Sequence, residues 1–305
     1  MTRYLFRRLL EIVPVTLIVA TLTFFMLHLA PGGPFAKDRR VSPEVLAQIN
    51  HYYGLDKSVP RQYGDYLGHL LHGDLGPSFK FPTRTVNELI GQAFPVSAEL
   101  GLYGLALALL LGIPAGIAAA SWHNRWPDFL LTTGVLLGIC IPSYVLGPAL
   151  ILFFAVDLGW FNTSGWYDWS DRVLPALVIG IGGAAGFARM TRSGMLEVLN
   201  QDYIRTARAK GASETAVVLR HALRGGLTPV LSGMGPALAD FLMGSFAVEI
   251  IFQIPGLGRL FVNSAFNRDY FMVMGSVLFY AVLLLLFNLL FDVVLVALNP
   301  RLRYE

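Results

Sequence analysis

Residues 200–224 read Asn200-Gln-Asp-Tyr-Ile-Arg-Thr-Ala-Arg-Ala-Lys-Gly211 followed by Ala-Ser-Glu-Thr-Ala-Val-Val-Leu-Arg-His-Ala-Leu-Arg224, a basic segment between two apolar stretches. Asp202 is placed to cap a short helix, and Gly211 suits the left-handed conformation in which helices often end. Ser213 is then placed to cap a second helix that leads into the next apolar stretch. The pattern therefore predicts a helix, a glycine turn and another helix.

The first of these helices combines small residues with positive charge. The small residues are Thr206, Ala207 and Ala209, and the basic ones are Arg205, Arg208 and Lys210. Small side chains would let another protein approach closely, so the segment suits a rigid element seated in a partner's groove. A basic loop that serves only membrane topology or lipid headgroups explains the same residues, and both interpretations stay open at this point.

The composition around this segment is that of a membrane protein. Of the 305 residues, 55% are hydrophobic and only 14% are charged, with a mean hydropathy of +0.58. A soluble domain usually carries about 25% charged residues, so lipid must form part of the solvent. The net charge of +3 reflects the usual basic bias of cytoplasmic loops, and we do not expect a nucleic-acid partner.

Apolar stretches long enough to cross a bilayer recur along the chain. A helix needs about 20 apolar residues for this, and the segments that qualify are 9–30, 97–122, 129–156, 174–187 with a short extension, 227–252 and 271–298. The first is longer than the apolar core of a signal peptide, so we expect an uncleaved anchor. The fold class predicted is an all-α membrane protein with six transmembrane helices.

The positive charges orient these spans. If the N-terminus is cytoplasmic, thirteen of the 23 Lys and Arg residues lie in the cytoplasmic segments, and the two short outer loops hold only Arg172, Arg259 and Arg268. Long loops translocate largely regardless of charge, so the basic residues of 31–92 count little. Both termini are therefore predicted to be cytoplasmic.

The order of the spans suggests three segments: a first transmembrane helix (1–30), an extracytoplasmic loop (31–96) and a core domain (97–305) that includes the cytoplasmic loop 196–224. In the extracytoplasmic loop, Ser42 and Pro43 mark a helix start, and residues 85–94 form a short amphipathic helix. His69 and His72 lack a third ligand nearby, so we expect solvated or locally bonded histidines and no metal site.

A few polar residues within the spans are candidates for the translocation pathway, because charges in a membrane usually face a cavity or a partner. Asp240 and Glu249 are nine residues apart and would lie on opposite faces of one straight helix. We assign Asp240 to the pathway and Glu249 to a structural pair around the loop 254–256. An equally open alternative is that both carboxylates have structural roles. Ser143 follows Pro142. It either contacts substrate or lies at a kink that serves only helix packing.

The segment Arg205-Thr-Ala-Arg-Ala-Lys-Gly211 resembles the coupling-loop motif of ABC importer permeases, E-A-A-x-x-x-G, in its peptide-transporter form. Three further stretches resemble the peptide permease family: 72–78 (His-Gly-Asp-Leu-Gly-Pro-Ser), 254–270, and the N-terminal Arg7-Arg8 with Leu-Ala-Pro-Gly-Gly33. The resemblance covers nearly the whole chain and is greatest to B subunits of oligopeptide permeases. Arg205 stands where the motif has Glu, and Arg224 stands where sugar permeases have Pro. These differences weaken an assignment to the sugar permeases and leave the assignment to the ABC importers unchanged.

The resemblance implies a type I ABC importer permease in the bacterial cytoplasmic (inner) membrane. Its implied partners are a homologous C-type permease subunit, two cytoplasmic ATPases and an extracytoplasmic peptide-binding protein. ATP and magnesium would be bound by the ATPases, because this chain has no G-x-x-x-x-G-K-[ST] loop and we expect no cofactor or catalytic site in it. Gly180-Ile-Gly-Gly-Ala-Ala185 indicates close helix packing instead of dinucleotide binding.

Other functions are distinguishable from this one. Dipeptides, nickel chelates or glutathione are alternative substrates for the same class of permease. An ion-coupled secondary transporter would need midplane carboxylates and an inverted repeat, and a membrane enzyme would need a nucleophile and base, whereas Cys140 and His28 lie on different spans without evident partners.

Overall fold

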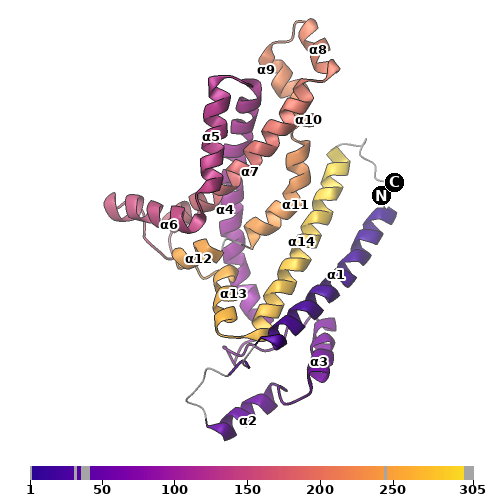
Figure 1. Ribbon diagram of the computed structural model, residues 1–305, viewed down its shortest axis with the longest axis vertical. Coiled ribbons are helices and arrows are strands. Elements are labelled where there is room, and N and C mark those ends of the chain that lie inside the picture. The colour runs from indigo at the N-terminus through magenta and orange to yellow at the C-terminus, as the bar shows by residue number, and fades with distance from the viewer. Residues whose placement is uncertain (1, 31–32, 36–41, 244–245, 299–305) are drawn as a thin grey trace. The chain divides into compact units, whose positions relative to one another are not determined.

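The computed structural model describes residues 2–30, 33–35, 42–243 and 246–298 (Figure 1). In these ranges the regular structure is helical, apart from an isolated bridge between Pro77 and Thr85. Arg301 and Arg303, which contribute to the predicted cytoplasmic C-terminus, lie outside the described residues.

The chain forms two compact units, Met1–Pro95 with Gly256–Leu285 and Val96–Pro255 with Leu286–Glu305. The sequence division into 1–30, 31–96 and 97–305 therefore differs from the structural one. Residues 256–285, which that division placed in the core domain, group with the N-terminal unit.

The first unit surrounds an aromatic core that includes Phe24, Tyr66, Phe79 and Tyr270. Its helices are α1 (Thr2–Leu29), α2 (Pro43–Tyr52), α3 (Val59–Leu71), α13 (Leu257–Phe266) and the first parts of α4 (Val86–Ser121) and α14 (Tyr270–Leu298). The helix start at Ser42 is confirmed, because its hydroxyl accepts a hydrogen bond from the Val45 amide and Pro43 opens α2. The expected local bonding of the histidines is also confirmed: His69 contacts Asp74, and His72 contacts the Gly68 carbonyl.

Asp269 joins two distant segments of this unit. The carboxylate is fully buried and accepts hydrogen bonds from the Ser78 hydroxyl at 2.5 Å and the Phe79 amide at 3.1 Å. Two of the stretches that carry the family resemblance, 72–78 and 254–270, thus meet in space. Buried carboxylates need such donors, so Asp269 fixes the segment around Ser78 and Phe79 to the start of α14.

The second unit contains the remaining elements. They are the rest of α4, α5 (Trp126–Cys140), α6 (Ser143–Leu150), the π-helix η1 (Ile151–Asp157), the 3₁₀-helix η2 (Trp169–Arg172), α7 (Val173–Leu199), α8 (Asp202–Ala209), α9 (Glu214–Ala216), the π-helix η3 (Val217–Ala222), α10 (Leu223–Gly226), α11 (Thr228–Leu242), α12 (Phe246–Ile251) and the end of α14. Helix α7 is central, with α5, α6, α10, α11 and α12 all packed on it.

Within the described residues, five helical segments are long and apolar enough to cross a membrane: Leu10–Leu29, Val86–Ser121, Trp169–Leu199, Thr228–Ile251 and Tyr270–Val294. They correspond to the first, second, fourth, fifth and sixth predicted spans. The fourth is longer than predicted because α7 continues to Leu199. The predicted amphipathic helix at 85–94 is not separate, since α4 runs unbroken from Val86 into the second span.

The third predicted span, 129–156, is not one continuous helix. Helix α5 ends at Cys140, Ile141 has an extended backbone (φ −85°, ψ 109°), and α6 begins at Ser143. Proline lacks an amide hydrogen and disfavours the helical conformation of the preceding residue, so Pro142 breaks the span. Figure 1 shows α6 running crosswise to α5.

Glycines hold α4 and α7 in close contact. A Cβ added to Gly112 would lie 2.5 Å from the Ala184 carbonyl oxygen, and one added to Gly116 would lie 2.5 Å from that of Ala188. These two glycines therefore form a packing seam between α4 and α7. Gly180 and Gly183 meet Leu107 and Phe241 in the same way, which supports packing as the role of the glycine run 180–185.

Replacing Gly112 with alanine is expected to destabilise the protein by about 1–3 kcal/mol, because the added methyl group forces the two helices apart. Thermal unfolding of the purified chain in detergent measures the effect. Gly182→Ala on α7 is the matched control, since its Cβ would meet no atom within 4 Å. Equal melting temperatures for the two variants would contradict the seam.

Candidate coupling site

The segment after α7 has the predicted helix–turn–helix form. Helix α8 spans Asp202–Ala209, Gly211 has φ +84°, and the Ser213 hydroxyl accepts a hydrogen bond from the Ala216 amide at 3.3 Å. The left-handed glycine and the serine cap are thus confirmed. Asp202 is not the cap, because Gln201 occupies that position and Asp202 begins the helix, where a negative charge still favours the helix dipole.

One face of α8 packs against the protein itself. Ile204 is fully buried and Ala207 is 9% exposed, and both belong to a cluster with Ala120 of α4 and Met195 of α7. Residues three apart share a helix face, so these two side chains point inward together. The small size of Ala207, which the sequence analysis related to a partner, thus allows α8 to pack closely within the chain.

The other face of α8 is exposed and basic. Its exposed residues are Asp202, Tyr203, Arg205, Thr206, Arg208 and Ala209, followed by Lys210 and Gly211. Arg208 donates two hydrogen bonds to the Glu214 carboxylate, at 2.8 and 3.2 Å, and this lowers the pKa of Glu214. The contribution of this pair to stability is present at neutral pH and is lost as the pH falls through the lowered pKa.

A cysteine placed on each face of α8 tests this orientation. In a Cys140→Ser background, which removes the single native cysteine, Ala209→Cys is expected to react rapidly with a maleimide in the isolated subunit, and Ala207→Cys slowly. If α8 docks on an ATPase, as the resemblance implies, the bound ATPase is expected to protect Ala209→Cys at least tenfold. Equal labelling with and without ATPase would argue against α8 as a docking element.

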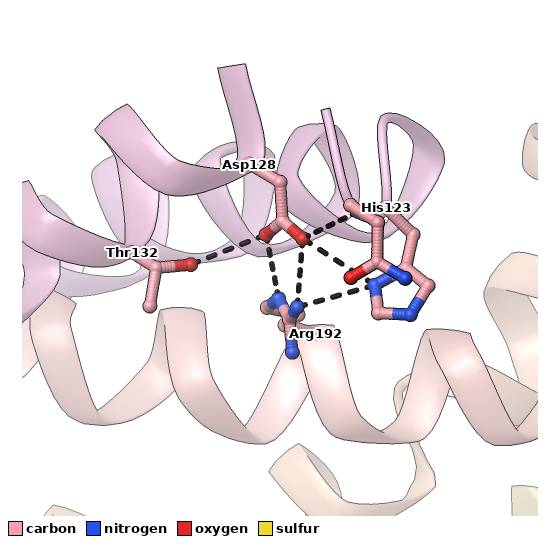
Figure 2. Close-up of polar contacts among 5 residues, drawn as sticks. His123, Asp128, Thr132 and Arg192 are labelled. Carbon is pink, nitrogen blue, oxygen red and sulfur yellow. Dashed lines mark hydrogen bonds and ion pairs between the residues drawn. The ribbon is translucent and has the colours of Figure 1, made fainter. Parts of the chain in front are cut away.

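A buried ion pair anchors the neighbouring loop to α7. Asp128, at the start of α5 and 4% exposed, accepts hydrogen bonds at 2.8 Å from Nε and Nη2 of Arg192 on α7 (Figure 2). The Thr132 hydroxyl and the Asn124 amide also donate to it, and His123 Nδ1 lies 3.3 Å away. A bidentate arginine pair of this kind fixes geometry strongly. Sequence analysis missed Asp128, although an acidic residue in the first turn of a helix is a recognisable signal.

The two predicted cytoplasmic loops meet at this end of the unit. A groove of about 1010 Å³ is lined by residues of the α4–α5 connection, such as Trp122 and Arg125, and of the coupling segment, such as Arg208 and Glu214. Figure 1 shows α8 and α9 beyond the ends of α5 and α10. The arrangement fits the predicted orientation, because loops on one side of the membrane come together.

The predicted outer ends of the same unit also meet. Glu249 is fully buried and its carboxylate accepts a 2.6 Å hydrogen bond from the Ser97 hydroxyl, while Arg172 pairs with Glu99 at 2.8 Å. The backbone carbonyl of Glu249 accepts a hydrogen bond from the Ile254 amide at 2.8 Å. Glu249 thus lies in the interior of the subunit, bonded to the start of the second span.

Asp240 and Ser143 occupy different surroundings. Asp240 is exposed on α11, and Ser143 is partly exposed at the start of α6. Asp240 and Glu249 do not share a straight helix, because α11 ends at Leu242 and α12 begins at Phe246. The predicted angle of 180° between them therefore does not apply.

The spans, the glycine seam and the exposed helix–turn–helix define a membrane component of a transport system. The chain belongs to the family "Binding-protein-dependent transport system inner membrane component", whose model matches residues 112–304, and the N-terminal model of such components matches residues 1–100. It is thus a multi-pass protein of the inner membrane.

Particular relatives cover the whole chain. It is 43% identical over 307 residues to the oligopeptide transport system permease protein OppB of Haemophilus influenzae, and 42% identical over 306 residues to OppB of Escherichia coli K12. It is also 42% identical over 307 residues to the glutathione transport system permease protein GsiC of Salmonella typhimurium. All three alignments cover 100% of both chains.

The inward-facing MetNI methionine ABC transporter has the same fold. Its chain aligns with a TM-score of 0.57 at 18% identity, covering 69% of this chain and 96% of that one.

Proposed function

We propose that this chain is one of two membrane subunits of an ATP-driven importer and that oligopeptides cross the membrane along it. The observation that carries the proposal is the full-length identity of 43% to an oligopeptide permease subunit, together with an exposed basic face on α8. The second subunit would be a homologous C-type permease, and an extracytoplasmic binding protein would deliver the peptide.

The coupling segment gives this proposal a mechanism. Two cytoplasmic ATPases would bind ATP and magnesium and close on them, moving α8 by its exposed face. Ile204 and Ala207 pack α8 on Met195 of α7 and Ala120 of α4, so the motion would pass directly to two spans. The Asp128–Arg192 pair would carry α5 along with α7. No chemistry on the substrate is required of this chain.

The pathway assignment remains a proposal of the same kind. Asp240 would border the pathway, because it is exposed on a helix of the membrane core, whereas Glu249 is enclosed in the subunit. Ser143 would lie beside the pathway at the break between α5 and α6.

Glutathione is a second candidate substrate, favoured by the 42% identity to a glutathione permease subunit. The test is import into proteoliposomes that contain the complete transporter and its binding protein. ATP-dependent accumulation of a labelled tetrapeptide that glutathione does not compete with would support the oligopeptide assignment. Accumulation of glutathione alone would replace it, and uptake driven by an ion gradient without ATP would overturn the transporter class.

A further inference from the structure

The groove of about 1010 Å³ beside the coupling segment has three walls, all within the second compact unit. They are the last turns of α4 with the connection that follows, the end of α7, and the segment from α8 to η3. The ends of α4 and α7 belong to two of the helices that are long and apolar enough to cross a membrane. The groove therefore extends from the ends of two spans into the predicted cytoplasmic region.

Polar and apolar side chains are separated along each wall of this groove. The residues nearer the middle of the spans are apolar: Ile117 and Ala118 on α4, Leu196 and Leu199 on α7, and Val218 and Leu219 on η3. The residues beyond them carry polar or charged groups: His123, Arg125, Asn200, Arg208 and Glu214. On α4 alone, the wall continues for about 10 Å from Pro114 to Ser121. Such a change in polarity fits an amphiphile, with its apolar part toward the membrane.

The charged residues of the groove leave one positive charge without a counter-charge. Arg208 pairs with Glu214 at 2.8 Å, and His123 lies 3.3 Å from the carboxylate of Asp128. Arg125, in contrast, is exposed, and its guanidinium makes no hydrogen bond or ion pair with the part of the chain that the structure describes. The polar end of the groove therefore favours an anion.

Two exposed tryptophans lie on either side of Arg125 in the α4–α5 connection. Trp122 is 47% exposed and lines the groove, and Trp126, which begins α5, is 73% exposed. Tryptophan is enriched where a membrane meets water, at the level of the lipid headgroups. The unpaired guanidinium of Arg125 is thus placed at the depth where a lipid phosphate would lie.

We propose that this groove binds one anionic phospholipid, with its phosphate on Arg125 and an acyl chain along Ile117, Leu196 and Val218. Basic pockets between membrane helices on the cytoplasmic side bind anionic headgroups in this way. A water-soluble ATPase can reach the exposed face of α8, but the apolar walls belong to the ends of two spans, where a lipid chain fits. The bound lipid would join the α4–α5 connection to the coupling segment.

The test is native mass spectrometry of the full-length chain, purified in a non-ionic detergent and titrated with dioleoyl phosphatidylglycerol or dioleoyl phosphatidylcholine. We expect the first phosphatidylglycerol to bind roughly fivefold more tightly than the first phosphatidylcholine, because one arginine near an anionic headgroup gives a preference of this size. Arg125→Gln should abolish the preference. Its melting temperature without lipid should equal that of the wild type, since Arg125 is exposed.

Two further variants and a soluble probe separate the parts of the site. Arg220→Gln removes the same charge from an exposed position on η3 that does not line the groove, and it should keep the preference. Leu219→Ser, at a side chain 55% exposed, removes part of an apolar wall and should weaken both lipids by the same factor, roughly threefold or more. sn-Glycerol 3-phosphate has the phosphate without the chains and should not displace the lipid.

Equal affinity of the wild type for the two lipids, or a preference that survives Arg125→Gln, would overturn the proposal. Loss of the preference in Arg220→Gln as well would attribute it to general surface charge, and displacement by glycerol 3-phosphate would make the groove a site for free phosphate. The assembled transporter should also retain phosphatidylglycerol, and its Arg125→Gln form should lose it. A wild-type transporter that retains none would assign the groove to an ATPase instead.

Discussion

Replacing Gly211 with valine is expected to reduce ATP-dependent import roughly tenfold or more while the chain still inserts and folds. Gly211 has φ +84°, and a Cβ there would meet no atom within 4 Å. The cost therefore comes from the backbone, because a non-glycine residue in the left-handed region costs about 1–2 kcal/mol and a β-branched one is a true outlier. The turn after α8 would relax and displace the exposed face that we assign to the ATPases. Import and co-purification of both ATPases measure the effect.

Two variants make this prediction specific. Gly211→Asn should retain most of the activity, because asparagine tolerates the left-handed conformation. Gly73→Val places the same strain at another glycine with free space, φ +73°, in the predicted extracytoplasmic loop, and should leave ATPase co-purification unchanged. If Gly73→Val lost the ATPases as readily as Gly211→Val, general instability would explain both.

Replacing Asp128 with alanine is expected to lower the free energy of unfolding by about 2–4 kcal/mol. The change leaves the Arg192 guanidinium, whose side chain is only 29% exposed, without its bidentate acceptor. Removing one partner of a buried pair usually costs about 3–5 kcal/mol, and the partial exposure of Arg192 reduces this. Denaturant unfolding of the purified chain gives the value.

A double variant separates the charge from the packing. Asp128→Ala combined with Arg192→Met should regain more than half of the lost stability, because no unpaired charge remains. The exposed pair Lys57–Asp65, with side chains 43% and 47% exposed, is the matched control. Asp65→Ala should cost less than about 1 kcal/mol. A double variant as unstable as the single one would show that the pair's charges are not what stabilises this contact.

Features set by local backbone rules could be predicted from the sequence. Gly211, Ser213 and Ser42 occupy their predicted conformations because a left-handed turn or a helix cap depends on a few adjacent residues. The break between α5 and α6 shows the limit of hydrophobic periodicity, although Pro142 itself indicated a kink. The surrounding stretch is apolar on every side, so hydrophobic periodicity carried no information about where one helix ends.

Contacts between distant segments could not be predicted in this way. The carboxylate of Asp269 reaches Ser78 across 191 residues, and Arg192 reaches Asp128 across 64. Likewise, the inward direction of Ala207 depends on how α8 packs on α4 and α7. A small residue suits both a partner's groove and the chain's own interior, and only the packed structure distinguishes them.

The most direct test of the central claim is ATP hydrolysis by the complete transporter in nanodiscs, with and without binding protein loaded with a short peptide. The account predicts that loaded binding protein raises the rate several-fold in the wild type and that Gly211→Val loses this response. A rate that never responds to peptide, or a Gly211→Val variant that responds like the wild type, would contradict it.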